Sequence, residues 1–131
     1  MKKVKAIVSG GKDLYGVWIE GAPIYSAGET LQKLKSNLQE SIDLYEEAVG
    51  ELPENMRGGY EIEYTFDITG ALRYYSQFIT YPALGKLSGI NPKQLWNYAN
   101  GYRRASSKTS EKIISSLHKF GNDLAQVRIS L

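Results

Sequence analysis

The sequence contains no cysteine, only one histidine and no long apolar run. The lack of cysteine excludes disulfides, thiolate zinc sites and cysteine nucleophiles. The first apolar run stops at Val8, which is too short for a secretory signal, and no later segment approaches membrane-spanning length. His118 has no carboxylate at a short spacing that would suggest a metal site or an acid–base pair. We therefore expect a cytoplasmic protein that has no metal or other cofactor and is not an enzyme.

Acidic residues are scarce in the second half of the chain. Residues 71–131 contain 9 Lys and Arg but only two acids, Glu111 and Asp123, so this half has a net charge of +7. Residues 1–70 contain 7 Lys and Arg and 12 Asp and Glu, a net charge of −5, and the total of +2 conceals this division. Opposite charge in two halves predicts two modules with different partners, and a polyanion suits the basic one.

Residues 1–68 have the pattern of a small α+β domain with the order β-β-β-α-β. Short strands are expected at Lys3–Ser9, Leu14–Glu20 and Pro23–Ala27. A change to helical spacing then predicts a helix capped by Thr30 and ended by Gly50. From residue 60 to 66, aromatic and aliphatic residues alternate with polar ones, which predicts a fourth strand. The expected fold is one small sheet covered on one side by a single helix.

The segment YGVWIEGAPIYSAGETLQKLKSNLQESIDLYEE, from Tyr15 to Glu47, resembles the antitoxin of the HicA–HicB toxin–antitoxin systems. In that family a Tyr-Gly strand leads through a proline and a Gly-x-Thr-Leu step into an acidic helix. Gln32 and Lys33 replace the usual Glu-rich start of that helix. The resemblance implies a reduced ribonuclease H fold and a small basic ribonuclease toxin of the HicA type as partner. The net negative charge is consistent with such a partner. We expect its contact region on the acidic helix face at Glu40, Asp43 and Glu47.

Residues 69–131 are expected to be all-α. A first helix face is predicted by Ala71, Leu72, Tyr75, Phe78 and Ile79. The stretch TYPALGKLSGINPKQLWNYANG then has capping residues at the expected starts of two further helices. Thr80 caps the second helix, and Asn91 caps the third, with Pro92 in its first position and Gln94 able to close the cap.

The steric pattern of this stretch resembles the helix-turn-helix of Xre-type repressors over about residues 71–121. Gly85 is the small residue between the helices, Gly89 is the turn glycine and Ile90 is the corner aliphatic residue. The inward anchors are Leu84, Leu87, Leu95 and Tyr98. Ser88 stands where an apolar residue is usual, and Pro92 where a base-reading glutamine is common. The resemblance and the charge together predict double-stranded operator DNA as a partner. The expected DNA-binding residues are Thr80, Asn91, Lys93, Gln94, Trp96, Asn97, Tyr102, Arg103, Arg104 and Lys108.

A last helix is expected from Ser107 to about Val127, with Gly121 as a point of bending or interruption. Its apolar face is longer than a three-helix core requires. It is therefore a candidate contact in a homodimer or a higher even oligomer.

Taken together, the patterns favour an antitoxin that neutralises a HicA-type toxin and represses its own operon. One alternative is a stand-alone helix-turn-helix regulator whose first half serves dimerisation or ligand sensing. A metal-dependent nuclease using Asp13 and Glu20 is a second alternative, which we do not expect because no acids gather on successive strands. An ordinary helical bundle with a basic face, or RNA binding by the ten tyrosines, would also fit parts of the pattern.

Overall fold

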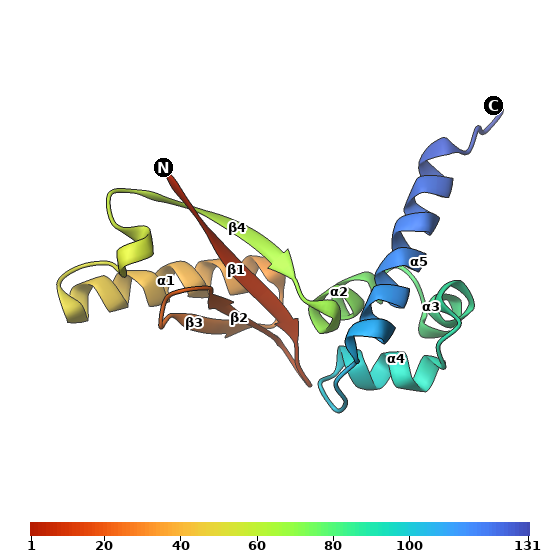
Figure 1. Cartoon of the computed structure of the whole chain (residues 1–131), viewed down its shortest axis with the longest axis horizontal. Coiled ribbons are helices and arrows are strands. Elements are labelled where there is room, and N and C mark those ends of the chain that lie inside the picture. Colours follow the sequence, from red (N-terminus) through yellow and green to blue (C-terminus); the bar gives the residue numbers. More distant parts are fainter.

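A computed structural model describes the whole chain, residues 1–131. It is an α+β structure in which a four-stranded sheet and one helix precede four further helices. We refer to residues 1–67 as the α+β half and to residues 68–131 as the helical half. The two halves lie end to end along the long axis of the molecule (Figure 1). The elements are β1 (Lys2–Gly10), β2 (Tyr15–Ile19), β3 (Tyr25–Gly28), α1 (Leu31–Val49), a short 3-10 helix (Glu54–Met56), β4 (Tyr60–Phe66), α2 (Ile68–Tyr75), α3 (Tyr81–Ser88), α4 (Pro92–Ala99) and α5 (Ser107–Gln126).

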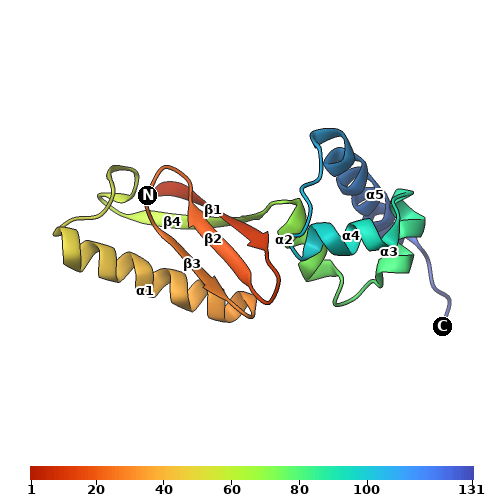
Figure 2. The ribbon, with the colours of Figure 1, turned by 90° about the horizontal axis from the view of Figure 1, so that it is seen from below.

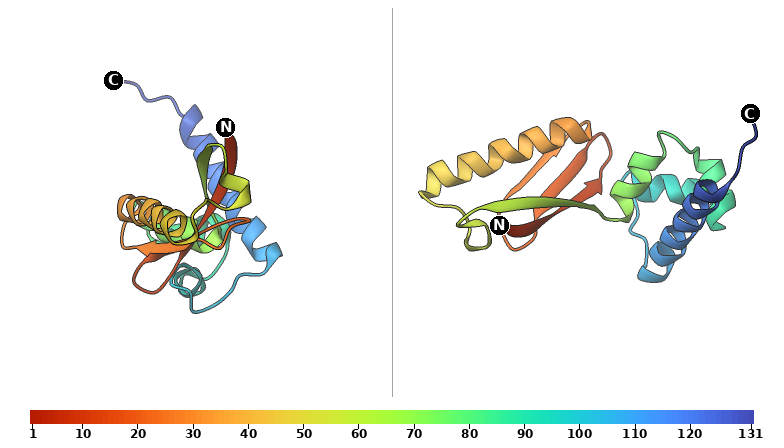
Figure 3. Two further views of the ribbon diagram at one scale, coloured as in Figure 1. Left: turned by 90° about the vertical axis from the view of Figure 1, so that its left-hand side faces the viewer. Right: turned by 90° about the horizontal axis from the view of Figure 1, so that it is seen from above.

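The sheet is mixed and has the strand order β3-β2-β1-β4. β1 pairs antiparallel with β2 and parallel with β4, and β2 pairs antiparallel with β3. α1 connects β3, at one edge of the sheet, to β4, which pairs with β1 at the opposite edge. α1 covers one face of the sheet and leaves the other face without a helix (Figures 2 and 3).

Two separate hydrophobic cores correspond to the two halves. The first contains 11 buried residues from the sheet, α1 and the 3-10 helix, and the second contains only 6, from α2 to α5. In the first core, alternate strand residues such as Val17 and Ile19 face Leu34, Leu38 and Ile42 of α1. The expectation of one small sheet covered by one helix is confirmed.

The bounds of α1 are also as expected from the sequence. The Thr30 hydroxyl oxygen accepts a hydrogen bond from the Lys33 backbone nitrogen at 3.1 Å and so caps the helix. Gly50 ends it in the left-handed conformation, with φ of 92°. This conformation favours glycine because it has no Cβ.

Other expected bounds are wrong. The third strand begins at Tyr25 instead of Pro23, because a turn at Gly21 (φ 81°) brings the Ile24 carbonyl oxygen to the Ile19 backbone nitrogen at 3.0 Å. The helix predicted to run to Ile79 ends at Tyr75, because the next backbone N–H groups, those of Gln77 and Phe78, donate to carbonyl oxygens three residues back, at Tyr74 and Tyr75, in a tight turn.

In α5, Gly121 does not interrupt the helix, which is continuous from Ser107 to Gln126. Its first half packs on the helical core through Ile113, while its second half projects away from the body of the protein (Figure 1).

The two halves meet where β4 ends and α2 begins, and the junction is built around Asp67. Its carboxylate accepts hydrogen bonds from the backbone nitrogen of Gly70 at 2.9 Å, from the Thr69 hydroxyl at 2.7 Å, and from the Ser9 hydroxyl of β1. The backbones also come close, because a Cβ atom at Gly70 would overlap the Val8 carbonyl oxygen. No flexible linker separates the sheet from α2.

Candidate nucleic-acid interface

The turn between α3 and α4 is set by capping residues at both helices. The Thr80 hydroxyl oxygen accepts from the Ala83 backbone nitrogen at 3.2 Å and caps α3. Gly89 ends α3 with φ of 75°, and the Asn91 side-chain oxygen accepts from the Lys93 backbone nitrogen at 2.8 Å to cap α4. The caps at Thr80 and Asn91 are confirmed.

Gly85 allows the two helices to approach closely. A Cβ atom at this position would lie 3.0 Å from the Ile90 carbonyl oxygen and 3.0 Å from the Pro92 ring. These separations are tighter than ordinary van der Waals contacts, so any side chain here would push the start of α4 away from α3.

The expectation that Leu87 faces the core is wrong, and Ser88 takes the inward position instead. Leu87 is 37% exposed, whereas Ser88 is 6% exposed. The Ser88 hydroxyl donates to the Leu84 carbonyl oxygen at 2.7 Å and accepts from the Ile90 backbone nitrogen at 3.2 Å. A buried hydroxyl is tolerated because both hydrogen bonds are made, and it ties the end of α3 to the turn.

The inner side of α4 consists of Leu95, Tyr98 and Ala99, all buried in the second core. Leu95 and Tyr98 are the two anchors expected from the sequence. On the outer side, Lys93 and Trp96 are exposed.

Gln94 does not close the helix cap as expected. It is half-buried, and its side-chain oxygen accepts a hydrogen bond from the Asn97 amide at 3.4 Å. The Asn91 side chain is itself engaged in capping. Lys93 and Trp96 are therefore the side chains of α4 that are best placed for an external contact.

The loop after α4 folds back onto the end of that helix. The backbone N–H groups of Tyr102 and Arg103 donate to the Asn97 carbonyl oxygen at 2.9 and 3.4 Å. The Trp96 and Tyr102 rings stack with centroids 5.4 Å apart and an interplanar angle of 10°. The structure thus brings together four of the expected DNA-binding residues, Trp96, Asn97, Tyr102 and Arg103.

The remaining expected residues are more dispersed. Arg104 lies in the same loop and Lys108 in the first turn of α5, and both are exposed. No hydrogen bond or ring contact joins Thr80 or Lys108 to the group around Trp96.

The surface around α4 is basic without local neutralisation. Residues 68–110 contain six Lys and Arg and no Asp or Glu. The chain has two ion pairs, Lys33–Glu29 and Arg57–Glu51, and both lie in the α+β half. Lys93, Arg103 and Arg104 therefore present charges that no carboxylate of this chain neutralises, which suits binding to phosphate groups.

The predicted acidic contact residues Glu40, Asp43 and Glu47 are exposed on α1, where Asp43 accepts a hydrogen bond from Gln39 at 3.0 Å. Beside them is Leu44, which is 56% exposed and which the sequence reasoning did not single out. Leu44 follows Glu40 by four residues and precedes Glu47 by three, so helical spacing alone places it on the same face of α1 as these acids.

Two further exposed aromatic residues lie on the sheet. Trp18 of β2 and Tyr25 of β3 are directly paired across the strands and are 42% and 77% exposed. They lie on the face opposite α1, because Val17 and Ile19 face the core. The alternation in β2 was the available signal, since it places Trp18 opposite to Val17.

Asp13 and Glu20, the residues weighed for metal-dependent cleavage, precede and follow β2 and are both exposed. No cluster of three or more Asp, Glu, His or Cys side chains suited to a metal ion occurs in the structure. His118 is exposed on α5.

None of the helices is both long and apolar enough to cross a lipid bilayer. Comparisons with known proteins supply no relative: no family model matches the chain, and neither a curated protein nor a solved structure matches it.

Proposed function

We propose that this protein is a type II antitoxin of the HicB kind, which binds and neutralises a HicA-type ribonuclease toxin in the cytoplasm and represses its own operon by binding DNA. The observation that carries the proposal is the charge division across the hydrogen-bonded junction at Asp67. An acidic α+β half is joined at Asp67 to a helical half that has six cations and no acid in residues 68–110. One chain thereby offers a surface for a basic protein and a surface for a polyanion.

The arrangement of α3 and α4 supports DNA binding through a helix-turn-helix. α4 would be the recognition helix, with Lys93 and Trp96 on its outer side. A lysine suits the acceptor atoms of guanine in the major groove. Arg103 and Arg104, in the loop held against α4, would contact phosphates and supply most of the affinity.

The α+β half supports the toxin-binding part of the proposal. Its order β-β-β-α-β is the one that the residue patterns predict, and this is the half that resembles HicB. On α1, the exposed Leu44 is flanked by Glu40, Asp43 and Glu47. An apolar residue with carboxylates along one side fits a basic partner, because the apolar contact supplies affinity and the charges supply complementarity.

The exposed end of α5 supports assembly of two copies. Ile113, Leu117, Phe120 and Leu124 follow one another along α5 at spacings of four, three and four residues. Ile113 is buried in the second core, whereas Leu124 is 61% exposed. Val127, which is 56% exposed, follows the end of the helix in an extended conformation. The apolar seam of α5 thus continues past the core, and such a seam suits pairing with a like helix.

The proposed partner on the α5 seam is a second copy of this chain. Two copies related by a two-fold axis would match operator half-sites about 34 Å apart. Leu124→Asp is expected to give a monomer by light scattering, whereas the exposed polar substitution Ser115→Asp leaves the assembly intact. A wild-type monomer at all concentrations would remove this part of the proposal.

The first experiment is a pull-down of the tagged chain co-expressed with its immediate upstream and downstream genes. We expect recovery of a small basic protein whose expression alone arrests growth. Binding of the purified chain to a duplex of its own promoter is measured in parallel by fluorescence anisotropy. A matched variant with Glu40, Asp43 and Glu47 changed to Gln is expected to lose the protein partner and to retain DNA binding.

The second candidate function is the stand-alone regulator with a ligand-sensing first half. The observation that favours it is a cavity between the two halves, described below. It predicts a chain that is recovered without a protein partner but with specific promoter binding. Failure of both protein capture and specific DNA binding would remove both candidates.

A further inference from the structure

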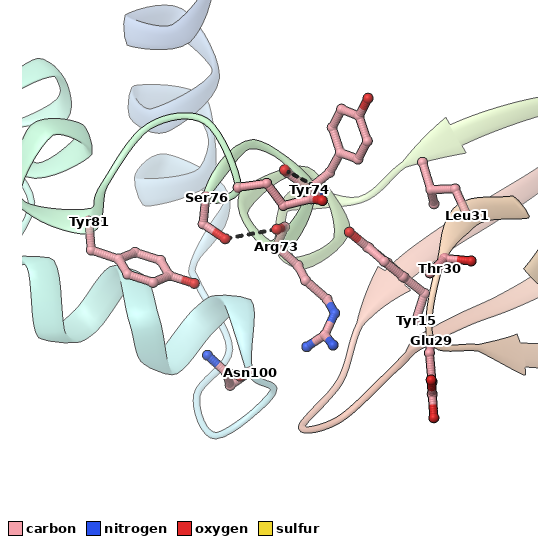
Figure 4. A pocket seen from close by; sticks show the side chains of 10 residues that line it. Tyr15, Glu29, Thr30, Leu31, Arg73, Tyr74, Ser76, Tyr81 and Asn100 are labelled. Atoms are coloured by element: carbon pink, nitrogen blue, oxygen red, sulfur yellow. Dashed lines mark hydrogen bonds between the residues drawn. The ribbon is translucent and has the colours of Figure 1, made fainter. Parts of the chain in front are cut away.

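A cavity of about 370 Å³ lies at the junction of the two halves. Its walls come from β2 and the start of α1 on one side and from α2, α3 and the end of α4 on the other. This volume falls in the range of small-molecule sites, roughly 300–1,000 Å³. Figure 4 shows the Arg73 side chain extending from α2 into this space, with Tyr81 and Asn100 on one side and Tyr15 on the other.

Arg73 is the only cation in the cavity wall, and no carboxylate pairs with it. Its guanidinium donates one hydrogen bond to the Gly11 carbonyl oxygen at 2.7 Å and lies 5.1 Å from the centroid of the Tyr15 ring. A guanidinium has five N–H donors in a planar fork. Several of its donors are thus free, while the bond to Gly11 and the contact with Tyr15 hold the side chain in place.

Tyr15 and Tyr81 line the same cavity as this guanidinium. Neither hydroxyl makes a hydrogen bond within the chain, and the Tyr15 oxygen remains accessible although the residue as a whole is only 4% exposed. Burial raises the pKa of Tyr15, an effect that the charge of Arg73 opposes in part. The Tyr15 hydroxyl therefore stays protonated at neutral pH and is able to donate.

Glu29 also lines the cavity, but its carboxylate is exposed and pairs with Lys33 at 3.6 Å. It therefore does not neutralise Arg73. The cavity combines one fixed cation with neutral hydroxyl donors, and this set matches an oxyanion, because planar guanidinium groups bind carboxylate and phosphate oxygens in a bidentate manner.

We propose that the cavity binds the carboxylate or phosphoryl group of a small anionic metabolite, with the Arg73 guanidinium and the hydroxyls of Tyr15 and Tyr81 as donors. The ligand would contact both halves at once, and would thereby hold α2, α3 and α4 in one orientation against the sheet. This inference rests on the cavity alone and does not require that the chain binds DNA or a toxin.

The test measures the melting temperature of the full chain against three probes: sodium phosphate, sodium succinate and adenosine monophosphate. Sodium chloride of equal ionic strength is the reference. We expect a saturable rise of about 2–4 °C from at least one probe, since a ligand that binds only the folded state stabilises it. A response to phosphate and the nucleotide identifies a phosphoryl ligand, and a response to succinate alone identifies a carboxylate.

Two variants locate the binding at the cavity. Arg73→Lys keeps the charge but removes the fork, and is expected to weaken binding by about 10- to 100-fold. Tyr81→Phe removes one hydroxyl while keeping the ring and the bond between Arg73 and Gly11, so it remains informative even where Arg73→Lys fails to fold. The matched control is Arg57→Lys, which changes the arginine paired with Glu51 in the other half.

No saturable response from any probe would overturn the proposal. It would also be overturned if the wild type, Arg73→Lys and Tyr81→Phe responded equally. Repeating the promoter-binding measurement with the responding probe shows whether the ligand regulates DNA binding. A chain that binds the probe but no DNA retains this inference and loses the proposed function.

Discussion

The two halves of the chain differ in how each is stabilised. In the α+β half, 11 buried residues form one core between the sheet and α1. In the helical half, six buried residues support four helices, and the second half of α5 contributes no buried residue. Since burial of apolar surface is the main favourable term in folding, the helical half has the smaller stability of its own. It is therefore expected to depend more on its junction with the sheet.

The largest expected effect on stability comes from truncating one leucine in each core. Leu95→Ala and Leu38→Ala both remove a side chain that is 0% exposed, and each is expected to cost about 3–4 kcal/mol. Leu95→Ala is expected to unfold the helical half below the melting temperature of the sheet, because it removes one of six core residues instead of one of eleven.

The two tryptophans make this difference measurable, since Trp18 lies in the α+β half and Trp96 in the helical half. Urea unfolding is followed by fluorescence in Trp18→Phe and Trp96→Phe backgrounds, so that each half has its own signal. Coincident transitions in the Leu95→Ala variant would mean that the halves unfold as one unit and would contradict the expectation.

The next test introduces a methyl group into the close contact between the two halves. Gly70→Ala places a methyl group against the Val8 carbonyl oxygen and is expected to destabilise the protein by about 2–3 kcal/mol. The matched control is Gly121→Ala on α5, where a Cβ atom meets nothing within 4 Å. That change is expected to stabilise the helix by about 0.5–1 kcal/mol. Thermal unfolding monitored by circular dichroism measures the stability of both variants. A Gly70→Ala variant as stable as the wild type would show that the junction accommodates a methyl group, against the expectation.

Loss of single charges from the helical half is expected to have a smaller effect, confined to DNA binding. Lys93→Ala should reduce specific promoter binding by about 1–2 kcal/mol and relax base preference, because Lys93 is on the outer side of α4. Arg104→Ala should weaken binding to all sequences and reduce the salt slope by about 1.

The control for both variants is Lys3→Ala, an equal loss of charge at an exposed position of β1 that pairs with Glu61, at the end of the sheet away from the helices. Anisotropy titrations at several salt concentrations distinguish the three variants. Equal losses of binding for Lys3→Ala and Lys93→Ala would indicate a non-specific effect of net charge instead of an interface at α4.

The smallest expected effect concerns alkaline pH in the α+β half. Burial raises the pKa of Tyr64 above its ordinary value of 10.0, and the neighbouring Tyr60 adds to the shift. Above pH ~10 the tyrosine of the unfolded chain ionises first, which favours the unfolded state. Stability conferred by this shift is fully present below that pH and decreases as the pH rises.

Tyr64→Phe should therefore lessen the loss of stability between about pH 8 and pH 10.5, measured by urea unfolding. Tyr25→Phe, at a site that is 77% exposed, is the control and should leave the loss unchanged. An unchanged loss in Tyr64→Phe would assign the alkaline sensitivity to other groups.

The sequence predicted the elements whose signals are local. Thr30 and Gly50 delimit α1 through capping and backbone conformation, and the alternation at residues 60–66 predicted β4. The resemblance to Xre-type repressors placed Ser88 where an apolar residue is usual, but the expectation that Leu87 also faces inward is wrong. Two hydrogen bonds that no pattern of hydrophobicity reports place the serine inside.

Features that join distant parts of the chain were beyond sequence reasoning. The parallel pairing of β4 with β1 depends on how the whole sheet assembles. The cavity depends on Arg73 reaching Gly11 and Tyr15, residues that are about sixty positions away in sequence. Likewise, the expected DNA-binding residues gave no sign that Trp96 stacks on Tyr102, since the stacking follows from the fold of the loop.

The hydrogen bonds of Asp67 have a thermodynamic consequence. Because this carboxylate joins Ser9 of β1 to the first turn of α2, a change in the orientation of the helices relative to the sheet would disturb its hydrogen bonds. A molecule that bound the sheet and favoured one orientation would therefore alter the affinity of the helices for a second ligand. By reciprocity, that second ligand would alter the affinity at the sheet by the same factor. Asp67 is thus the place in this fold where binding at one half would be felt energetically at the other.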